Sequence, residues 1–115
     1  LSHDLGVQVD NTIWVSGMVA FAPDGDIIGL GDMRIQADTV FANIAEVLAL
    51  GDAALDDVVK ITAWLTDMDL YSGYNDARAA AFSGRLPASA TIHSPRLVRD
   101  GLLVEVEAVA ILGAD

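Results

Sequence analysis

The polar and apolar positions along the chain change their period several times, and each period predicts a different element. The stretches 7–9 and 13–15 are apolar and are separated by the turn pair Asp10-Asn11, which predicts two short strands. Ser16-Gly17 is expected to end the second strand. Pro23-Asp24-Gly25 then predicts a turn, because proline fixes one backbone dihedral and glycine accepts a positive φ.

Two later segments have the spacing of helices. Between residues 35 and 50, apolar side chains recur at three- and four-residue steps, which predicts an amphipathic helix that stops at Gly51. Residues 70–82 are rich in alanine, a strong helix former, and predict a second helix.

Three further strands are predicted around and after these helices. Residues 57–67 alternate apolar and polar side chains, although Trp64 interrupts the polar face and suggests that something covers it. Strands are also expected at 89–94 and 102–112. The last of them is almost entirely apolar, as in a central strand that is buried on both faces.

The resulting order is β-β-(β)-α-β-α-β-β, where the brackets mark an optional third strand. Helices that connect strands of one sheet indicate an α/β or α+β layer. A chain of 115 residues is expected to form one domain, residues 1–115.

Composition excludes several classes of protein. The chain has 17 acidic and 6 basic residues, and Lys60 is its one lysine, so a surface that tracks nucleic-acid phosphates is not expected. The acidity itself is explained by solubility. The absence of cysteine excludes disulfides, thiolate catalysis and zinc–sulfur sites, and fits a cytoplasmic protein. No apolar run is long enough to predict a membrane span, and no secretory signal is recognisable.

Few residues suggest chemistry by themselves. Glu105 and Glu107 lie two apart in a predicted strand, so both point to one face. That face either meets solvent or a neighbouring subunit, or it forms the wall of a cleft where a carboxyl of raised pKa could hold or activate water. Asn75 fits a helix cap or a surface position, and Ser16-Gly17 fits a turn. The two histidines are too far apart in sequence to argue for a metal site.

The stretch from Pro87 to Ile92 contains only small side chains between its ends, namely Ala88, Ser89, Ala90 and Thr91. Such a run either lets a ligand approach the backbone closely or fills a tight packing site. The residues alone leave both interpretations open.

Five segments together resemble the Rid (YjgF-type) family: "WVSGMVA", "IQADTVFANIAEVLALGDAALDDVVKITAWLTDM", "YNDARAAAF", "LPASAT" and "LLVEVEAVA". They cover nearly the whole chain in the family's order. The resemblance implies a chorismate-mutase-like fold of the bacillus type, a single mixed sheet with two helices on one face. It also implies a homotrimer with inward-facing sheets and a cleft at each subunit interface. Known members hydrolyse reactive enamines and imines derived from amino acids and need no metal or organic cofactor.

The resemblance also implies roles for particular residues. Glu105 matches the first glutamate of the family's "EIE" and would hold the attacking water, which makes it the expected catalytic residue. Thr91 occupies a position whose backbone N–H faces the ligand. The other positions expected to contact a small-molecule ligand are Ser16, Gly17, Met18, Asn75, Ser89, Ala90 and Glu107.

Several positions depart from the family pattern. Met18 replaces a usual glutamine, while Leu1 falls at an aromatic position and His3 near another glutamine. The main departure is Ser89, which stands where the family's "PARS" arginine grips the substrate carboxylate. A hydrogen bond to a charged group contributes ~1.5–3 kcal/mol, so a simple 2-imino acid is expected to bind poorly. Three arginines could replace the missing cation: Arg85, Arg96 and Arg99.

Three functions follow from these observations. The first is a divergent Rid-type hydrolase whose imine or enamine substrate differs from simple 2-imino acids. The second is a non-catalytic trimer that binds a small metabolite, which Ser89 and Met18 favour because both make the cleft less polar. The third, an RNA-cleaving translation inhibitor, is opposed by the net charge of -11 and by the lack of a catalytic histidine pair.

Overall fold

The chain folds into one sheet of five strands in a computed structural model that describes residues 4–113. The predictions for Leu1 and His3 concern residues outside this range. The strands are β1 (Gly6–Val9), β2 (Thr12–Met18), β3 (Val58–Leu65), β4 (Ala88–His93) and β5 (Val104–Ile111). Their order across the sheet is β1-β2-β5-β3-β4, and β3 and β4 are its parallel pair.

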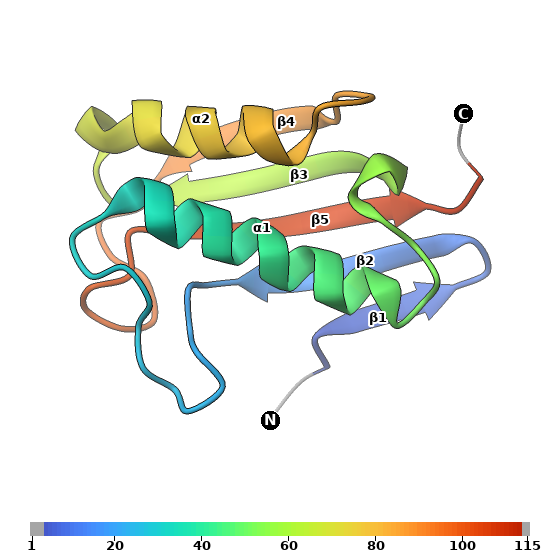
Figure 1. The fold of residues 1–115 in the computed structure, drawn as a ribbon, viewed down its shortest axis with the longest axis horizontal. Coiled ribbons are helices and arrows are strands. Elements are labelled where there is room, and N and C mark those ends of the chain that lie inside the picture. The colour runs from blue at the N-terminus through green and yellow to red at the C-terminus, as the bar shows by residue number, and fades with distance from the viewer. Residues whose placement is uncertain (1–3, 114–115) are drawn as a thin grey trace.

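Two helices, α1 (Met33–Ala49) and α2 (Tyr71–Ala81), lie on the same face of this sheet (Figure 1). The element order is therefore β-β-α-β-α-β-β. The optional third strand does not form, since residues 19–32 make a loop with a single isolated bridge between Phe21 and Ile27.

The helix boundaries follow from local capping. α1 begins two residues before its predicted start because the Asp32 side chain accepts a hydrogen bond from the Ile35 N–H and caps the first turn. A 3₁₀ turn at Met68–Leu70 precedes α2, and in it Asp67 accepts a bond from the Asp69 N–H. Asn75 therefore lies beyond the first turn of α2, and not at its cap.

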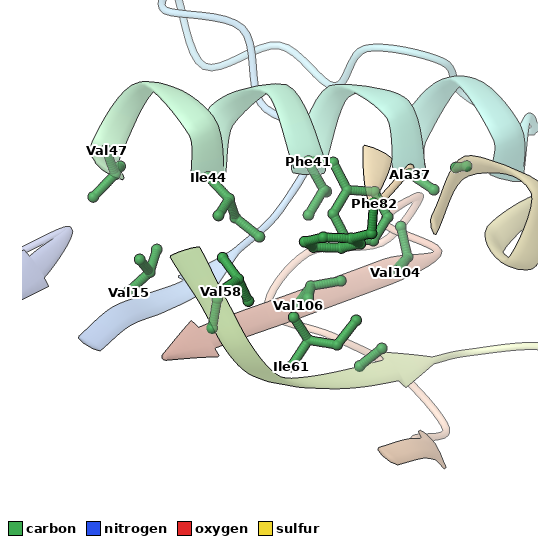
Figure 2. Close-up of a cluster of buried hydrophobic side chains, with 14 of the residues drawn as sticks. Val15, Ala37, Phe41, Ile44, Val47, Val58, Ile61, Phe82, Val104 and Val106 are labelled. Carbon is green, nitrogen blue, oxygen red and sulfur yellow. The ribbon is translucent and has the colours of Figure 1, made fainter. Parts of the chain in front are cut away.

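The hydrophobic core lies between α1, α2 and the sheet. Figure 2 shows Phe41 and Ile44 of α1 pointing toward Val106 of β5. The Phe41 and Phe82 rings meet edge to face with centroids 5.5 Å apart, an arrangement favoured by the charge distribution of aromatic rings. The core thus fixes α2 above β3 and β4, which positions one part of the candidate site.

The opposite face of the sheet is covered by no element of the described chain, and we call it the bare face. In β5, Val104, Val106, Ala108 and Ala110 are buried toward the helices, whereas the alternate residues are half-buried or exposed. The prediction that this strand is buried on both faces is therefore wrong for the single chain. Apolar side chains are nevertheless exposed on this face, namely Val7, Val9, Trp14, Ile92 and Ile111.

The strand β2 contains an irregularity at its end. Val15 pairs with Ala108 and Met18 pairs with Val106, so β2 has one more residue than β5 over this interval, as in a β-bulge. Ser16-Gly17 forms the bulge and does not end the strand, which runs on to Met18. The prediction of a strand-ending turn at this pair is wrong.

Gln36 connects three parts of the fold from the buried side of α1. Its Nε2 donates to the carbonyl oxygens of Gly29 and Gly101 at 3.1 and 2.9 Å, and its Oε1 accepts from the Leu103 N–H at 2.9 Å. The side chain is fully buried, so these bonds compensate for its removal from water. Gln36 thereby ties the loop before α1 to the segment that enters β5.

Of the helices described, none has both the length and the apolar character that crossing a membrane requires.

Candidate functional site

Glu105 lies on the bare face, near the middle of the sheet. Its register partner on β3 is Trp64, and its carboxylate lies directly against Gly17 of the β2 bulge. A Cβ at Gly17 would overlap Glu105 Oε2, so glycine is the residue that leaves room for the carboxylate there. Partial burial raises the pKa of Glu105, and the nearby charge of Glu107 raises it further.

Glu107 shares the bare face with Glu105, as the two-residue spacing predicts. It pairs in register with Thr62 of β3 and is exposed. Its main effect on Glu105 within one chain is therefore electrostatic.

The remaining residues of the bulge have other contacts. The Ser16 hydroxyl donates to the Asp4 carbonyl oxygen at 2.6 Å, and the Ser16 N–H donates to the Leu5 carbonyl oxygen. Met18 packs against the hydrophobic core. Of this predicted group, Gly17 is therefore the residue that the structure brings against Glu105.

The small-residue strand β4 forms one edge of the sheet. The Ser94 N–H donates to the Leu65 carbonyl oxygen of β3 at 2.9 Å. Because strand N–H groups alternate in direction, those of Ser89 and Thr91 point outward from the free edge. The Ala90 side chain faces the bare face, since its strand neighbour Ser89 faces α2.

Arg78 of α2 was not among the arginines that the sequence suggested, yet its guanidinium lies beside Ser89. Nη1 donates to Ser89 Oγ at 2.9 Å, and Nη2 donates to Asn75 Oδ1 at 2.7 Å and to the Tyr71 hydroxyl oxygen at 3.0 Å. The guanidinium carbon also lies 5.3 Å from the centroid of the Tyr74 ring. The signal that could have revealed Arg78 is its position three residues after Asn75, which places both on one helix face.

The Tyr74 hydroxyl belongs to the same group of side chains. It is buried, and its oxygen has no hydrogen-bond partner in the described part of the chain. Burial raises the pKa of Tyr74, although Arg78 and the nearby Ser89 and Thr91 side chains oppose that rise.

A pocket of about 340 Å³ opens beside this cluster. Asn75, Arg78 and Ser89 are its polar walls. Apolar side chains complete the lining, namely Ala79, Phe82, Leu86 and Pro87. Of the run of small residues, Ser89 lines this pocket.

The three arginines suggested by the sequence lie elsewhere. Arg85 donates to the Asp56 carbonyl oxygen at 3.2 Å. Arg99 donates to the Gly25 carbonyl oxygen and lies over the Phe21 ring. Arg96 has no side-chain hydrogen bond within residues 4–113.

The predicted site residues thus form two groups in one chain. Glu105, Glu107 and Gly17 lie on the bare face, whereas Asn75, Ser89 and the Thr91 side chain lie on the helix face or at the β4 edge. Strand β3 separates β5 from β4. Over residues 4–113, no three histidine or acidic side chains come together as metal ligands.

This fold and these residues define a small α+β protein with a carboxylate on an uncovered sheet face. The sequence profile of a family described as Endoribonuclease L-PSP matches residues 2–112. The chain therefore belongs to this family, the YjgF/Rid family.

Named relatives agree with this assignment. A mouse protein named 2-iminobutanoate/2-iminopropanoate deaminase is 36% identical over 111 residues, which cover 96% of this chain and 82% of the mouse protein. A RutC family protein of Pyrococcus abyssi is 34% identical over 108 residues, covering 94% and 84%. The crystal structure of RidA from an Antarctic Psychrobacter superposes with a TM-score of 0.89 at 29% identity, covering 96% and 88%.

The relatives' names differ in activity and compartment. Some are called imine deaminases, while the family description refers to an endoribonuclease. A yeast relative, 27% identical over 110 residues, is named as mitochondrial. The cytoplasmic location of this chain stays a prediction.

Proposed function

We propose that this protein hydrolyses the C=N bond of a small imine, or of the imine tautomer of an enamine, with Glu105 as the general base. The observation that carries the proposal is the Glu105 carboxylate, held against Gly17 on the bare face with a raised pKa. A carboxylate of raised pKa accepts a proton more readily, as activation of water requires. The mouse relative named as an imine deaminase supports the same reaction class.

The reaction balances without any cofactor. Glu105 takes a proton from a water molecule while the water oxygen bonds to the imine carbon, and it returns this proton to the nitrogen, which gives a neutral carbinolamine. Glu105 then takes the hydroxyl proton of the carbinolamine and passes it to the nitrogen, so that the C=O bond forms as the C–N bond breaks, and ammonia and a carbonyl compound leave. The outward Thr91 N–H would donate a hydrogen bond to the reacting group and stabilise developing charge.

We further propose that the complete site forms between subunits of a homotrimer. Glu105 lies on one side of the sheet, and Asn75 and Ser89 lie on the other, so a single chain does not bring them together. The bare face presents exposed apolar side chains, such as Trp14, that a neighbouring subunit would cover. In that arrangement Ser16, Gly17 and Glu105 of one subunit would meet Asn75, Ala90 and Thr91 of the next.

The charge beside Ser89 determines which substrate class the site would accept. The prediction that the substrate differs from simple 2-imino acids rests on the uncharged Ser89. Arg78 donates a hydrogen bond to Ser89, so a positive charge lies next to this position although Ser89 itself has none.

The test is an ammonia-release assay on imines generated enzymatically in the cuvette, including 2-iminopropanoate and a neutral aromatic imine. The wild type is expected to accelerate hydrolysis of at least one imine, and Glu105→Gln is expected to abolish that acceleration while it retains the assembly of the wild type. Acceleration that is equal in wild type and Glu105→Gln would contradict the role of this carboxylate.

Ser89 and Met18 leave a second candidate, a trimer that binds a metabolite without turnover. No acceleration of any imine, together with a ligand that raises the melting temperature and is recovered unchanged, would support this binding role over hydrolysis.

A further inference from the structure

The guanidinium of Arg78 is a cation without an anionic partner in the described part of the chain. Its hydrogen-bond partners are all neutral: the amide oxygen of Asn75 and the hydroxyl oxygens of Tyr71 and Ser89. The ion pair found among residues 4–113 lies elsewhere, between Arg34 and Asp38. In a chain with 17 acidic residues, an arginine held only by neutral groups retains its full charge for a ligand.

The neutral partners also fix the position of this charge. Three guanidinium N–H bonds go to Asn75, Tyr71 and Ser89, and the Tyr74 ring lies next to the guanidinium. An arginine has five N–H donors in a rigid plane, so one donor on Nη1 and the donor on Nε are left without a partner in the described chain. A preoriented fork with free donors is the arrangement that recognises carboxylates.

The pocket beside Arg78 gives such a ligand a place to bind. Its volume is about 340 Å³, and the polar side chains occupy one part of its lining. The remainder is apolar and consists of Ala79, Phe82, Leu86 and Pro87. A ligand with a negatively charged end next to Arg78 and a short aliphatic chain against the apolar walls would match both the polar and the apolar lining.

A second observation concerns a buried polar group next to the pocket. The Tyr74 hydroxyl is fully buried and lacks a partner within the described residues, and it lies near Ser89, Thr91 and Arg78. Burial of an unpaired hydroxyl is unfavourable unless a ligand or a water molecule completes its hydrogen bond.

We propose that Arg78 is the anion anchor of this pocket and that the ligand is a small organic carboxylate with a short aliphatic chain. The guanidinium reaches the Ser89 position from α2, so the site has a cation although strand β4 carries none there. Binding of the carboxylate depends only on this pocket. The further statement that the bound carboxylate is part of the substrate rests on the proposed hydrolase function. It would make 2-imino acids the substrate class.

The experiment measures binding, so it does not depend on turnover. The probes are 2-oxobutanoate and its neutral amide, 2-oxobutanamide, titrated into the whole protein and followed by ¹⁵N–¹H correlation spectra. Loss of hydrogen bonds to a charged group predicts that the wild type binds the acid about 10- to 100-fold more tightly than the amide. Arg78→Met, of similar length and without charge, is expected to weaken binding of the acid more than binding of the amide and so to remove this preference.

Two further variants make the result specific. Arg34→Met removes an exposed arginine of α1 and is expected to alter neither affinity. Arg78→Lys keeps the charge but loses the planar fork, so it is expected to retain a reduced preference for the acid, and it serves as the test if Arg78→Met does not fold.

Equal binding of acid and amide by the wild type, or an unchanged preference in the Arg78 variants, would overturn the proposal. Failure of the hydrolase function would have a different signature. Tight, Arg78-dependent binding of 2-oxobutanoate by a protein that hydrolyses no imine would sustain the anchor and reject the catalysis. Hydrolysis of neutral imines by a protein that binds the acid no more tightly than the amide would sustain the catalysis and reject the anchor.

Discussion

Replacement of Gln36 by methionine should destabilise the fold well beyond the usual effect of a single substitution. Methionine has a similar length and no polar head group, so the core volume is nearly retained while three hydrogen bonds disappear. The Leu103 N–H loses its partner inside the protein, and so do the Gly29 and Gly101 carbonyls. At about 1 kcal/mol for each bond, and more for a buried group left unsatisfied, the expected loss is about 3–5 kcal/mol.

Urea unfolding followed by circular dichroism measures this loss at a fixed protein concentration. For a domain of this size, each kcal/mol corresponds to a shift in melting temperature of about 4 °C, so the melting temperature of Gln36→Met should be about 12–20 °C below that of the wild type. Gln8→Met is the matched control, because Gln8 is exposed and makes one 3.3 Å bond to the Asp10 carbonyl oxygen. If Gln36→Met were no more destabilising than Gln8→Met, the idea that Gln36 ties these segments together would be refuted.

Three other predictions concern the bare face. Because the pKa of Glu105 is raised above its ordinary value of 4.5, the unfolded chain releases this proton first as pH rises, and stability falls across the window between the two values. Urea titrations should therefore show Glu105→Gln to be more stable than wild type above that window and no more stable below it; equal stability at both pH values would argue against the shift. Gly17→Ala should displace the Glu105 carboxylate and lower kcat/KM by ~100-fold, with a change in stability of less than about 1 kcal/mol because the carboxylate ends a flexible side chain. If the chain forms the proposed trimer, Trp14→Asp should convert it to monomers in light scattering, whereas Leu50→Asp, at an 85% exposed position just after α1, should not; a wild type that is already monomeric would reject the trimer.

The sequence predicted the elements better than their surroundings. The alternation of Ile61, Ala63 and Leu65 predicted β3, because strand periodicity depends only on neighbouring residues. The same rule placed Glu105 and Glu107 on one face. Trp64 suggested that this face is covered, but no local pattern identifies what would cover it, because the described chain supplies no covering element.

The errors have similarly clear causes. Ser16-Gly17 has the composition of a turn, yet β5 continues beside it and the extra residue is accommodated as a bulge. Arg78 does not follow from the family pattern, because that pattern places the cation on the strand, at the position of Ser89. Its relevance arises when α2 packs over β4, which brings residues eleven positions apart to 2.9 Å.

The bare face of the sheet has a consequence for how variants of this chain should be interpreted. Residues such as Val7, Val9 and Ile111 are exposed in the single chain, so their contribution to stability would come from association with a neighbour. A substitution there would leave the isolated fold almost unchanged and still lower the melting temperature of a dilute sample. A dilution series of each variant would separate the two cases, because a defect in association disappears at high protein concentration and a defect in the core does not.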